Sequence, residues 1–292
     1  MLRQRGVALV QVLLVTTIIM LLVMQLSLTA AEQVRKAQAM RDRSEAELYL
    51  RSREAALLYT LLTEPLVPAP GSENPYAANW NFHGRPFVVD GIEITLQDQS
   101  GLMRFPVSDV AQFRKLLETL GAGPTQARET AGQLATWLGI GLSPGGPVGD
   151  AMMRGGTGGP LQYLGELRFL DGMNEQLYRQ LAGLMTLYPN PGFNPATAPG
   201  PILRMQMSDS AASALLEARA RGELDSNRLW EIARIAADEV VSVNVGPGIS
   251  MRLAGEYRGV ALSHKAVVGV QPYDITSVSV WGRERFVAEA LQ

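Results

Sequence analysis

The chain has 292 residues and a nearly balanced charge, with 26 Lys and Arg against 28 Asp and Glu. Its hydrophobic content of 47% supports a packed core and argues against global disorder. The absence of cysteine excludes disulfides, thiolate zinc sites, iron–sulfur clusters and a cysteine nucleophile. A formal charge of −2 provides no general electrostatic attraction to nucleic acid.

An uncharged segment near the N-terminus is the strongest feature of the sequence. Residues 1–6 contain Arg3 and Arg5 and end in Gly6, and the next 25 residues, Val7 to Ala31, carry no charge. About 20 apolar residues, each rising about 1.5 Å in a helix, cross the hydrocarbon core of a bilayer. The positive-inside rule keeps the two arginines cytoplasmic, so the sequence predicts one membrane span with the bulk of the chain beyond it.

Three interpretations of this segment are a cleaved signal peptide, a plain signal anchor and the first half of a longer helix. A signal peptide has an apolar region of about 7–15 residues, which is shorter than the segment found here. The long helix accounts for more of the sequence, because no Pro or Gly interrupts residues 7–64. A largely apolar stripe recurs every three or four residues in its second half, and we expect this half to pack on a soluble domain. The stripe consists of Ala37, Met40, Ser44, Leu48, Arg51, Ala55, Leu58 and Leu62.

A short basic leader that ends in Gly, directly before a long apolar helix, resembles the type IV pilin and pseudopilin class. The resemblance implies that prepilin peptidase cuts between Gly6 and Val7 and that Val7 is then methylated. Most subunits of this class carry Glu at the fifth mature position, where a carboxylate in lipid needs a partner. The fifth mature residue here is Gln11. The K class of minor pseudopilins in type II secretion typically lacks this Glu and caps the tip, where no subunit above offers an amine.

The rest of the chain predicts short strands, then helices, then strands again. Pro65–Pro86 indicates a loop, and Phe87–Gln97 indicates strands that turn at Asp90-Gly91. Helices are predicted at 109–120, 125–138, 161–170, 174–187, 208–221 and 226–239, with Ser108, Asn174 and Ser226 as N-caps. From Val240 the pattern returns to strands (VVSVNV, ISMRLAGEY, GVALSHKAVVGV and TSVSVWG), with Gly255 marking a bulge or bend.

This order predicts an α+β fold: a pilin-like long N-terminal helix on a small antiparallel sheet, with a large all-helical domain inserted in the sheet. The predicted division is a leader (1–6), a membrane half (7–31) and a soluble half (32–64) of the long helix, a pseudopilin α/β domain (65–104 and 240–292) and an inserted helical domain (105–239). Among pseudopilins, the K class carries such an insertion. The phrases LQYLGELRFLDGMNEQLYRQL and FNPATAPGPIL also resemble stretches of that class.

Few residues of the chain suggest catalysis. Gly141–Gly145 fits the G-x-S-x-G pattern, but Pro144 after Ser143 lacks the N–H that an oxyanion hole needs, and a Gly/Pro loop follows in place of a helix. We interpret His83 and His264 as surface or packed histidines. Leu138–Gly141 resembles the hairpin of DNA-binding helix-hairpin-helix modules, but no lysine lies near it, so we expect no nucleic-acid binding.

Calcium is the one metal that the resemblance suggests, since several K-class relatives bind it through clustered acids in the helical domain. Calcium takes six to eight oxygen ligands. Here Asp109, Glu118, Glu129 and Asp150 are scattered, so we expect no metal and no cofactor; a site formed by Asp150 and Glu166 is the alternative.

The resemblance implies a non-enzymatic minor pseudopilin with no catalytic residues. It would cross the inner membrane once, expose its globular part to the periplasm, initiate assembly at the pseudopilus tip and support protein export across the outer membrane. The implied partners are the I- and J-class minor pseudopilins, then the H class and the major pseudopilin, the inner-membrane assembly platform, prepilin peptidase and the secreted substrate. Two alternatives remain open: a membrane-anchored periplasmic enzyme with a serine or carboxylate site, and a minor pilin of a type IV pilus.

Overall fold

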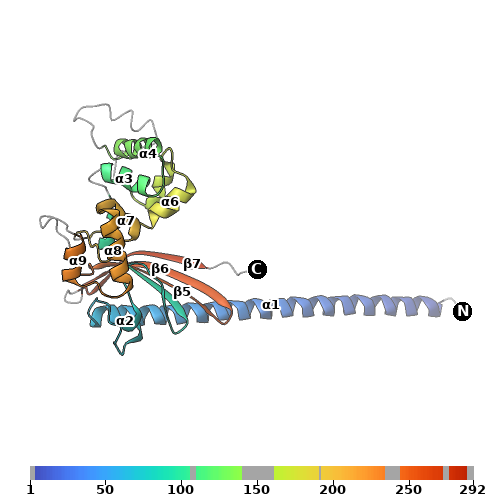
Figure 1. The fold of residues 1–292 in the computed structure, drawn as a ribbon. Helices are drawn as coiled ribbons and strands as arrows, with labels where there is room; N and C mark the ends of the chain where they lie inside the picture. The colour runs from blue at the N-terminus through green and yellow to red at the C-terminus, as the bar shows by residue number, and fades with distance from the viewer. Residues whose placement is uncertain are drawn as a thin grey trace.

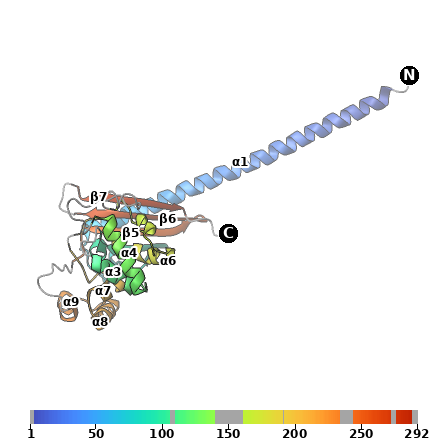
Figure 2. The same cartoon turned by 90° about the horizontal axis from the view of Figure 1, so that it is seen from above.

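A computed structural model describes residues 4–105, 110–139, 161–190, 192–233, 244–271 and 276–287. It contains a long N-terminal helix, an antiparallel sheet against the second half of that helix, and a group of helices beyond the sheet (Figure 1). The first half of the long helix extends away from the body in both views (Figures 1 and 2). The predicted α+β class, with a pilin-like helix and a helical insertion, is confirmed.

The long helix, α1 (Gln4–Thr63), runs for 60 residues. No proline or glycine after Gly6 interrupts it, and Pro65 disfavours a helical conformation at Glu64. Beyond Ala31 the helix becomes charged, and pairs one turn apart form on its surface, such as Lys36 Nζ with Glu32 Oε1 at 2.6 Å. The change from apolar to charged sequence divides α1 into a first half with the composition of a membrane span and a second half whose surface suits water.

The main sheet has the order β1-β2-β5-β6-β7 in the described part of the chain, with every neighbouring pair antiparallel. The strands are β1 (Phe87–Val89), β2 (Ile92–Asp98), β5 (Gly248–Tyr257), β6 (Val260–Val270) and β7 (Val278–Val287). The predicted turn at Asp90-Gly91 is confirmed, with φ of 50° and 77° as a tight hairpin requires. The strand predicted after this turn is confirmed as β2, in which Ile92, Ile94 and Leu96 are buried at every second position.

The predicted bulge or bend at Gly255 is wrong. Gly255 pairs in regular register with Leu262, and the irregularity in the sheet lies between Val267 and Val268. A Cβ atom at Gly255 would overlap the Ile92 side chain. The glycine therefore makes room for a neighbouring core residue, which is the other common role of glycine in a strand.

The first hydrophobic core lies between α1 and the sheet. Leu57 and Leu61 of α1 are fully buried, as are Ile94 and Leu96 of β2 and Leu253 of β5. A short helix, α2 (Pro75–Asn79), covers part of the same core with Tyr76 and Ala77. The Asn74 side chain caps α2 by accepting the Tyr76 N–H at 3.0 Å.

The insertion leaves the sheet after β2 and returns at β5. These strands are adjacent in the sheet, so the intervening chain departs from and rejoins one end of it. Its described elements are β3 (Met103–Arg104), α3 (Val110–Thr119), α4 (Pro124–Trp137), the 3₁₀ helix η2 (Leu164–Phe169), α6 (Glu175–Ala182), β4 (Met185–Thr186), α7 (Gly200–Gln206), α8 (Asp209–Ala220) and α9 (Ser226–Ala233). They enclose a second hydrophobic core around Phe113, Leu134 and Leu167.

Several local predictions for the insertion need correction. The Asn174 cap is confirmed, but the helix after it ends at Ala182 and not at Leu187, because Met185 and Thr186 pair with β3. The residues predicted as a helix at 161–170 form only a 3₁₀ segment. At α9 the cap is Asp225, whose Oδ1 accepts the Arg228 N–H at 2.7 Å.

Other predictions lie partly or wholly outside the described residues. These include the Ser108 cap, the end of the helix predicted to reach Glu239, and residues 240–243 of the predicted strand VVSVNV. The last two residues of that strand, Asn244 and Val245, are described and are not in a strand.

Candidate functional site

The first half of α1 has the length and composition of a membrane span. Its most apolar 18-residue window has a mean hydropathy of 2.4, and none of that window is buried in the molecule. The hydroxyl of Thr17 donates to the Leu13 carbonyl at 2.7 Å, and that of Thr29 donates to the Gln25 carbonyl at 2.9 Å. Such bonds satisfy hydroxyl groups without water. Alpha1 therefore fits a single-pass membrane anchor, although a signal sequence shares these properties.

The predicted processing residues lie in this half. Gly6 and Val7 are in the helical backbone of α1, but residues 1–3 and the side chains of residues 4–8 lie outside the described part of the chain. Gln11 is exposed on α1. Leader cleavage and the role of Gln11 stay predictions.

The soluble half of α1 corrects the expectation about its apolar stripe. Met40 and Leu48 are 71% and 66% exposed, and Ala37, Ser44, Arg51 and Ala55 are exposed as well. The face that packs on the sheet is a different one, made by Ala46, Leu50, Glu54, Leu57 and Leu61. Leu58 and Leu62, at the end of the predicted stripe, are partly buried and pack on the same core. Alpha1 therefore has two apolar stripes, one covered by the sheet and one that is bare over residues 37–55.

Glu54 is the reason why the sequence pattern did not predict the stripe of α1 that packs on the sheet. This carboxylate interrupts the apolar spacing, yet it is only 4% exposed. His264 Nδ1 of β6 lies 2.8 Å from its Oε2, and Arg283 Nη2 of β7 lies 3.0 Å from its Oε1. A buried charge needs partners of this kind. The cluster fastens α1 to two adjacent strands.

The same cluster bears on the enzyme alternative. The fold brings His264 to an acid, which the sequence spacing did not show. However, the side chains of His264 and Glu54 are only 10% and 6% exposed, between the helix and the sheet. A catalytic pair must reach its substrate. This arrangement therefore suits packing, in agreement with the interpretation of His264 as a packed histidine.

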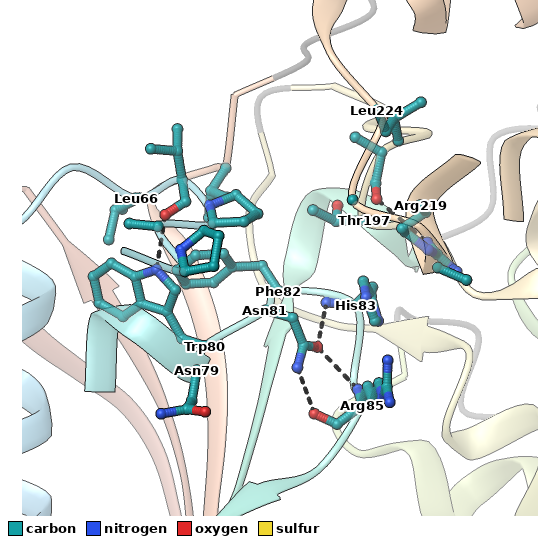
Figure 3. Close-up of a pocket in the computed structure, with 18 of the residues that line it drawn as sticks. Leu66, Asn79, Trp80, Asn81, Phe82, His83, Arg85, Thr197, Arg219 and Leu224 are labelled. Atoms are coloured by element: carbon teal, nitrogen blue, oxygen red, sulfur yellow. Dashed lines mark hydrogen bonds between the residues drawn. The ribbon is translucent and has the colours of Figure 1, made fainter. Parts of the chain in front are cut away.

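The other histidine, His83, lies at the edge of a pocket between the loop before β1 and the inserted domain (Figure 3). It forms a β-bridge with Gln97. Burial, and then the charge of Arg219, lower the pKa of His83 to about 4. The imidazole is therefore neutral at pH 7.

Polar side chains join the sheet to the insertion. Asp98, at the end of β2, is completely buried. Its Oδ1 accepts the Ser100 N–H at 2.9 Å, and its Oδ2 accepts bonds from Asn194 Nδ2 at 3.0 Å and Thr197 Oγ1 at 2.9 Å. The Thr186 hydroxyl donates to Gln99 Oε1 at 2.6 Å beside them. The sequence did not predict this junction, although Asn194 and Thr197 lie in the FNPATAPGPIL stretch that resembles the K class.

The metal and serine candidates are only partly within the described chain. Gly141–Gly145 and Asp150 lie outside it. Glu166 is described, and its Oε1 accepts the Gln162 N–H at 3.3 Å. Across the described ranges no group of three or more His, Asp or Glu side chains could hold a metal ion. The expectation of no metal and no cofactor remains a prediction.

Comparisons with known proteins agree with this architecture. Residues 95–190 match the family model for protein K of the type II secretion system. Protein K of the type II secretion system of Klebsiella pneumoniae is 28% identical over 204 residues, a match that covers 61% of this chain and 61% of that protein. The chain thus spans about three fifths of the length of this curated relative.

A solved structure agrees as well. One chain in the crystal structure of the GspK–GspI–GspJ complex from enterotoxigenic Escherichia coli matches with a TM-score of 0.53 and 17% identity. The match covers 86% of the present chain and 99% of that one, so the two share a fold. In its long helix, its interrupted sheet and its helical insertion, the chain is therefore similar to protein K of the type II secretion system.

Proposed function

We propose that the chain is the minor pseudopilin at the tip of a type II secretion pseudopilus, where it initiates assembly and supports protein export. The observation that carries this proposal is the bare apolar stripe of α1. It includes Met40 and Leu48 and follows the exposed apolar residues of the membrane half along the same helix. A helix fixed to its own sheet on one face and apolar on another is suited to pack against helices of other subunits.

The position of the insertion supports a place at the tip. The helical domain joins the end of the sheet that lies farther from the first half of α1 (Figure 1). If α1 crosses the inner membrane with its first half, the insertion is the part of the molecule farthest from the bilayer. There it would crown the fibre in the periplasm and contact the secreted substrate.

The proposed partners are the I- and J-class minor pseudopilins first, because the matched chain comes from the structure of a complex named for GspK, GspI and GspJ. The H-class and major pseudopilins, the inner-membrane assembly platform and prepilin peptidase would follow. In this role the protein needs no catalytic residue, metal or cofactor.

A charge introduced on the bare stripe tests the proposal. In cells that co-express the full chain with I- and J-class pseudopilins, Leu48→Glu should lower recovery of the heteromer at least tenfold. The matched control is Val88→Glu in β1, because Val88 is 63% exposed and Leu48 is 66% exposed. Unchanged recovery with Leu48→Glu, or equal losses for both variants, would contradict packing through this stripe.

Leader processing is tested separately. Mass spectrometry should find the wild-type chain beginning at a methylated Val7. Gly6→Leu should keep the leader and abolish secretion, because the peptidase needs a small residue before the cut, and Gly6→Ala is the conservative control. Normal removal of residues 1–6 from Gly6→Leu would refute this assignment, whereas an intact Met1 in the wild type would indicate a plain anchor.

Gln11 tests the tip position. An unpaired carboxylate within the membrane costs on the order of a few kcal/mol. A tip subunit has no amine above it, so Gln11→Glu should not improve assembly and Gln11→Leu should cost little. If Gln11→Leu stops secretion while Gln11→Glu is fully active, residue 11 acts as a polar partner inside the fibre, and the tip position is wrong.

A further inference from the structure

The pocket beside His83 has an apolar wall and a polar wall. Its volume is about 810 Å³, within the range of about 300–1,000 Å³ that ligand sites occupy. Figure 3 shows Leu66 and Trp80 on one side, and His83 and Arg219 on the other. The Trp80 indole N–H donates to the Val67 carbonyl at 2.8 Å, which holds the apolar wall in place.

Arg219 of α8 supplies a partly buried positive charge to the polar wall. Its Nη1 donates to the carbonyls of Ala198 at 2.8 Å and Ala196 at 3.3 Å. Burial lowers the pKa of Arg219 to about 10, so the group stays charged at neutral pH. Among the ion pairs that the described residues form, none includes Arg219. Carbonyl groups orient the guanidinium but do not neutralise it.

The other charged groups of the pocket do not offset Arg219. Arg85, at the rim, is also positive and exposed. Arg221 has partners of its own, with Glu223 Oε2 2.8 Å from its Nε. The acid among the lining residues, Asp225, caps α9 through its Oδ1. The pocket therefore combines an unneutralised cation, a histidine and a rigid apolar wall.

We propose that this pocket binds the end of a short extended peptide, whose C-terminal carboxylate pairs with Arg219 while its apolar side chains pack on Leu66 and Pro68. One partly buried cation matches a monoanion, and a carboxylate is the monoanion that guanidinium binds with two parallel hydrogen bonds. The accessible part of the apolar wall is formed by Leu66, Pro68 and Pro70, with the rings of Trp80 and Phe82 buried behind it, and it favours apolar residues next to that carboxylate. This inference does not depend on the tip role, because assembly through α1 does not use the pocket.

The test compares two forms of one peptide on the full chain in detergent micelles. The probe is fluorescein-labelled Gly-Pro-Leu-Ala-Val with either a free C-terminal carboxylate or a C-terminal amide, measured by fluorescence anisotropy. The acid should bind the wild-type chain at least tenfold more tightly than the amide. Arg219→Gln should remove this preference, whereas Arg221→Gln at the rim should change it less than twofold.

Arg219→Gln also loses its hydrogen bonds to two carbonyls, so it could disturb the local structure. A second measurement therefore uses the unaltered chain. The chain has two histidines, so His83 can be followed by NMR and assigned with His83→Asn. Saturation with the acid should raise the pKa of His83, because the carboxylate offsets the field of Arg219, and the amide should not. Equal binding of both peptides, binding of neither, or stronger competition by inorganic phosphate than by acetate would overturn the proposal.

Discussion

The two hydrophobic cores of the molecule are assembled from very different stretches of chain. The sheet core joins α1 and β2, before the insertion, to β5 and β6, after it. The insertion core draws all its buried members from residues 103–229, which follow one another along the chain. A core of local contacts closes with less loss of chain entropy than one that waits for distant strands. The insertion therefore has the organisation of a separate folding unit, and the sheet depends on both of its halves.

The contact between the two cores is polar, whereas the cores themselves are apolar. Asp98, Asn194 and Thr197 connect them by directional hydrogen bonds between buried polar groups. The backbones are also close, since a Cβ atom at Gly101 would lie 2.6 Å from the Thr197 carbonyl oxygen. Apolar packing tolerates small shifts, whereas a satisfied polar network specifies one arrangement. We infer that this junction sets the orientation of the insertion on the sheet.

The strongest test of the comparison truncates one large side chain in each core. Phe113→Ala in the insertion should cost about 3–5 kcal/mol of unfolding free energy, and Leu61→Ala in the sheet core about 2–5 kcal/mol, because both side chains are fully buried. Hydrogen exchange should locate the damage: Phe113→Ala should speed exchange within the insertion and leave β5 and β6 protected. Equal acceleration throughout the chain would show that the cores unfold as one.

Removing the charged link between α1 and the sheet should have the next largest effect. Glu54→Ala leaves His264 and Arg283 without this partner and should cost about 3 kcal/mol by chemical denaturation. The control is Glu47→Ala, whose surface pair with Arg43 is 3.5 Å apart and should contribute less than about 0.5 kcal/mol. Similar costs for the two variants would mean that the buried cluster does not fasten the helix.

A smaller loss is expected from the junction. Asp98→Asn replaces an acceptor of three hydrogen bonds by an amide, and should cost about 2–3 kcal/mol, since bonds to a charged group contribute about 1.5–3 kcal/mol each. The matched control is Asp90→Asn, which alters an exposed pair with Arg53 and should cost less than about 1 kcal/mol. Small-angle scattering of Asp98→Asn should show a broader range of shapes. An unchanged profile would show that the junction does not set the orientation of the insertion on the sheet.

The smallest expected effect is a pH dependence that originates beside the junction. The folded chain holds the pKa of His83 at about 4, against an ordinary value of 6.5. Between these values the unfolded chain binds more protons than the folded chain, so unfolding free energy rises with pH across this window. Because the imidazole is partly exposed, we expect the change to be about 1–2 kcal/mol. His83→Asn should make the unfolding free energy depend less on pH between pH 4 and pH 6.5. A slope equal to that of the wild type would show that other groups cause the pH dependence.

The sequence indicated much of the local structure correctly. The glycine-free run after Gly6 predicted α1, and Asp90-Gly91 predicted the first hairpin. The cap at Asn174 lies where it was expected, because its side chain accepts a hydrogen bond from the backbone N–H three residues later. The strands predicted at 249–257 and 259–270 are confirmed as β5 and β6, with bounds that differ by one residue.

The sequence by itself determined what adjacent residues can decide: an apolar helix long enough to span a membrane, the first hairpin, and the change from strands to helices and back to strands. Only the tertiary structure decided which stripe of α1 is covered, since the burial of Glu54 depends on His264 and Arg283, more than 200 positions later in the chain. The same holds for the junction at Asp98 and the pocket at Arg219, whose partners lie on distant segments. Spacing along a chain reports local backbone geometry, whereas the neutralisation of a buried charge depends on which distant groups the fold brings to it.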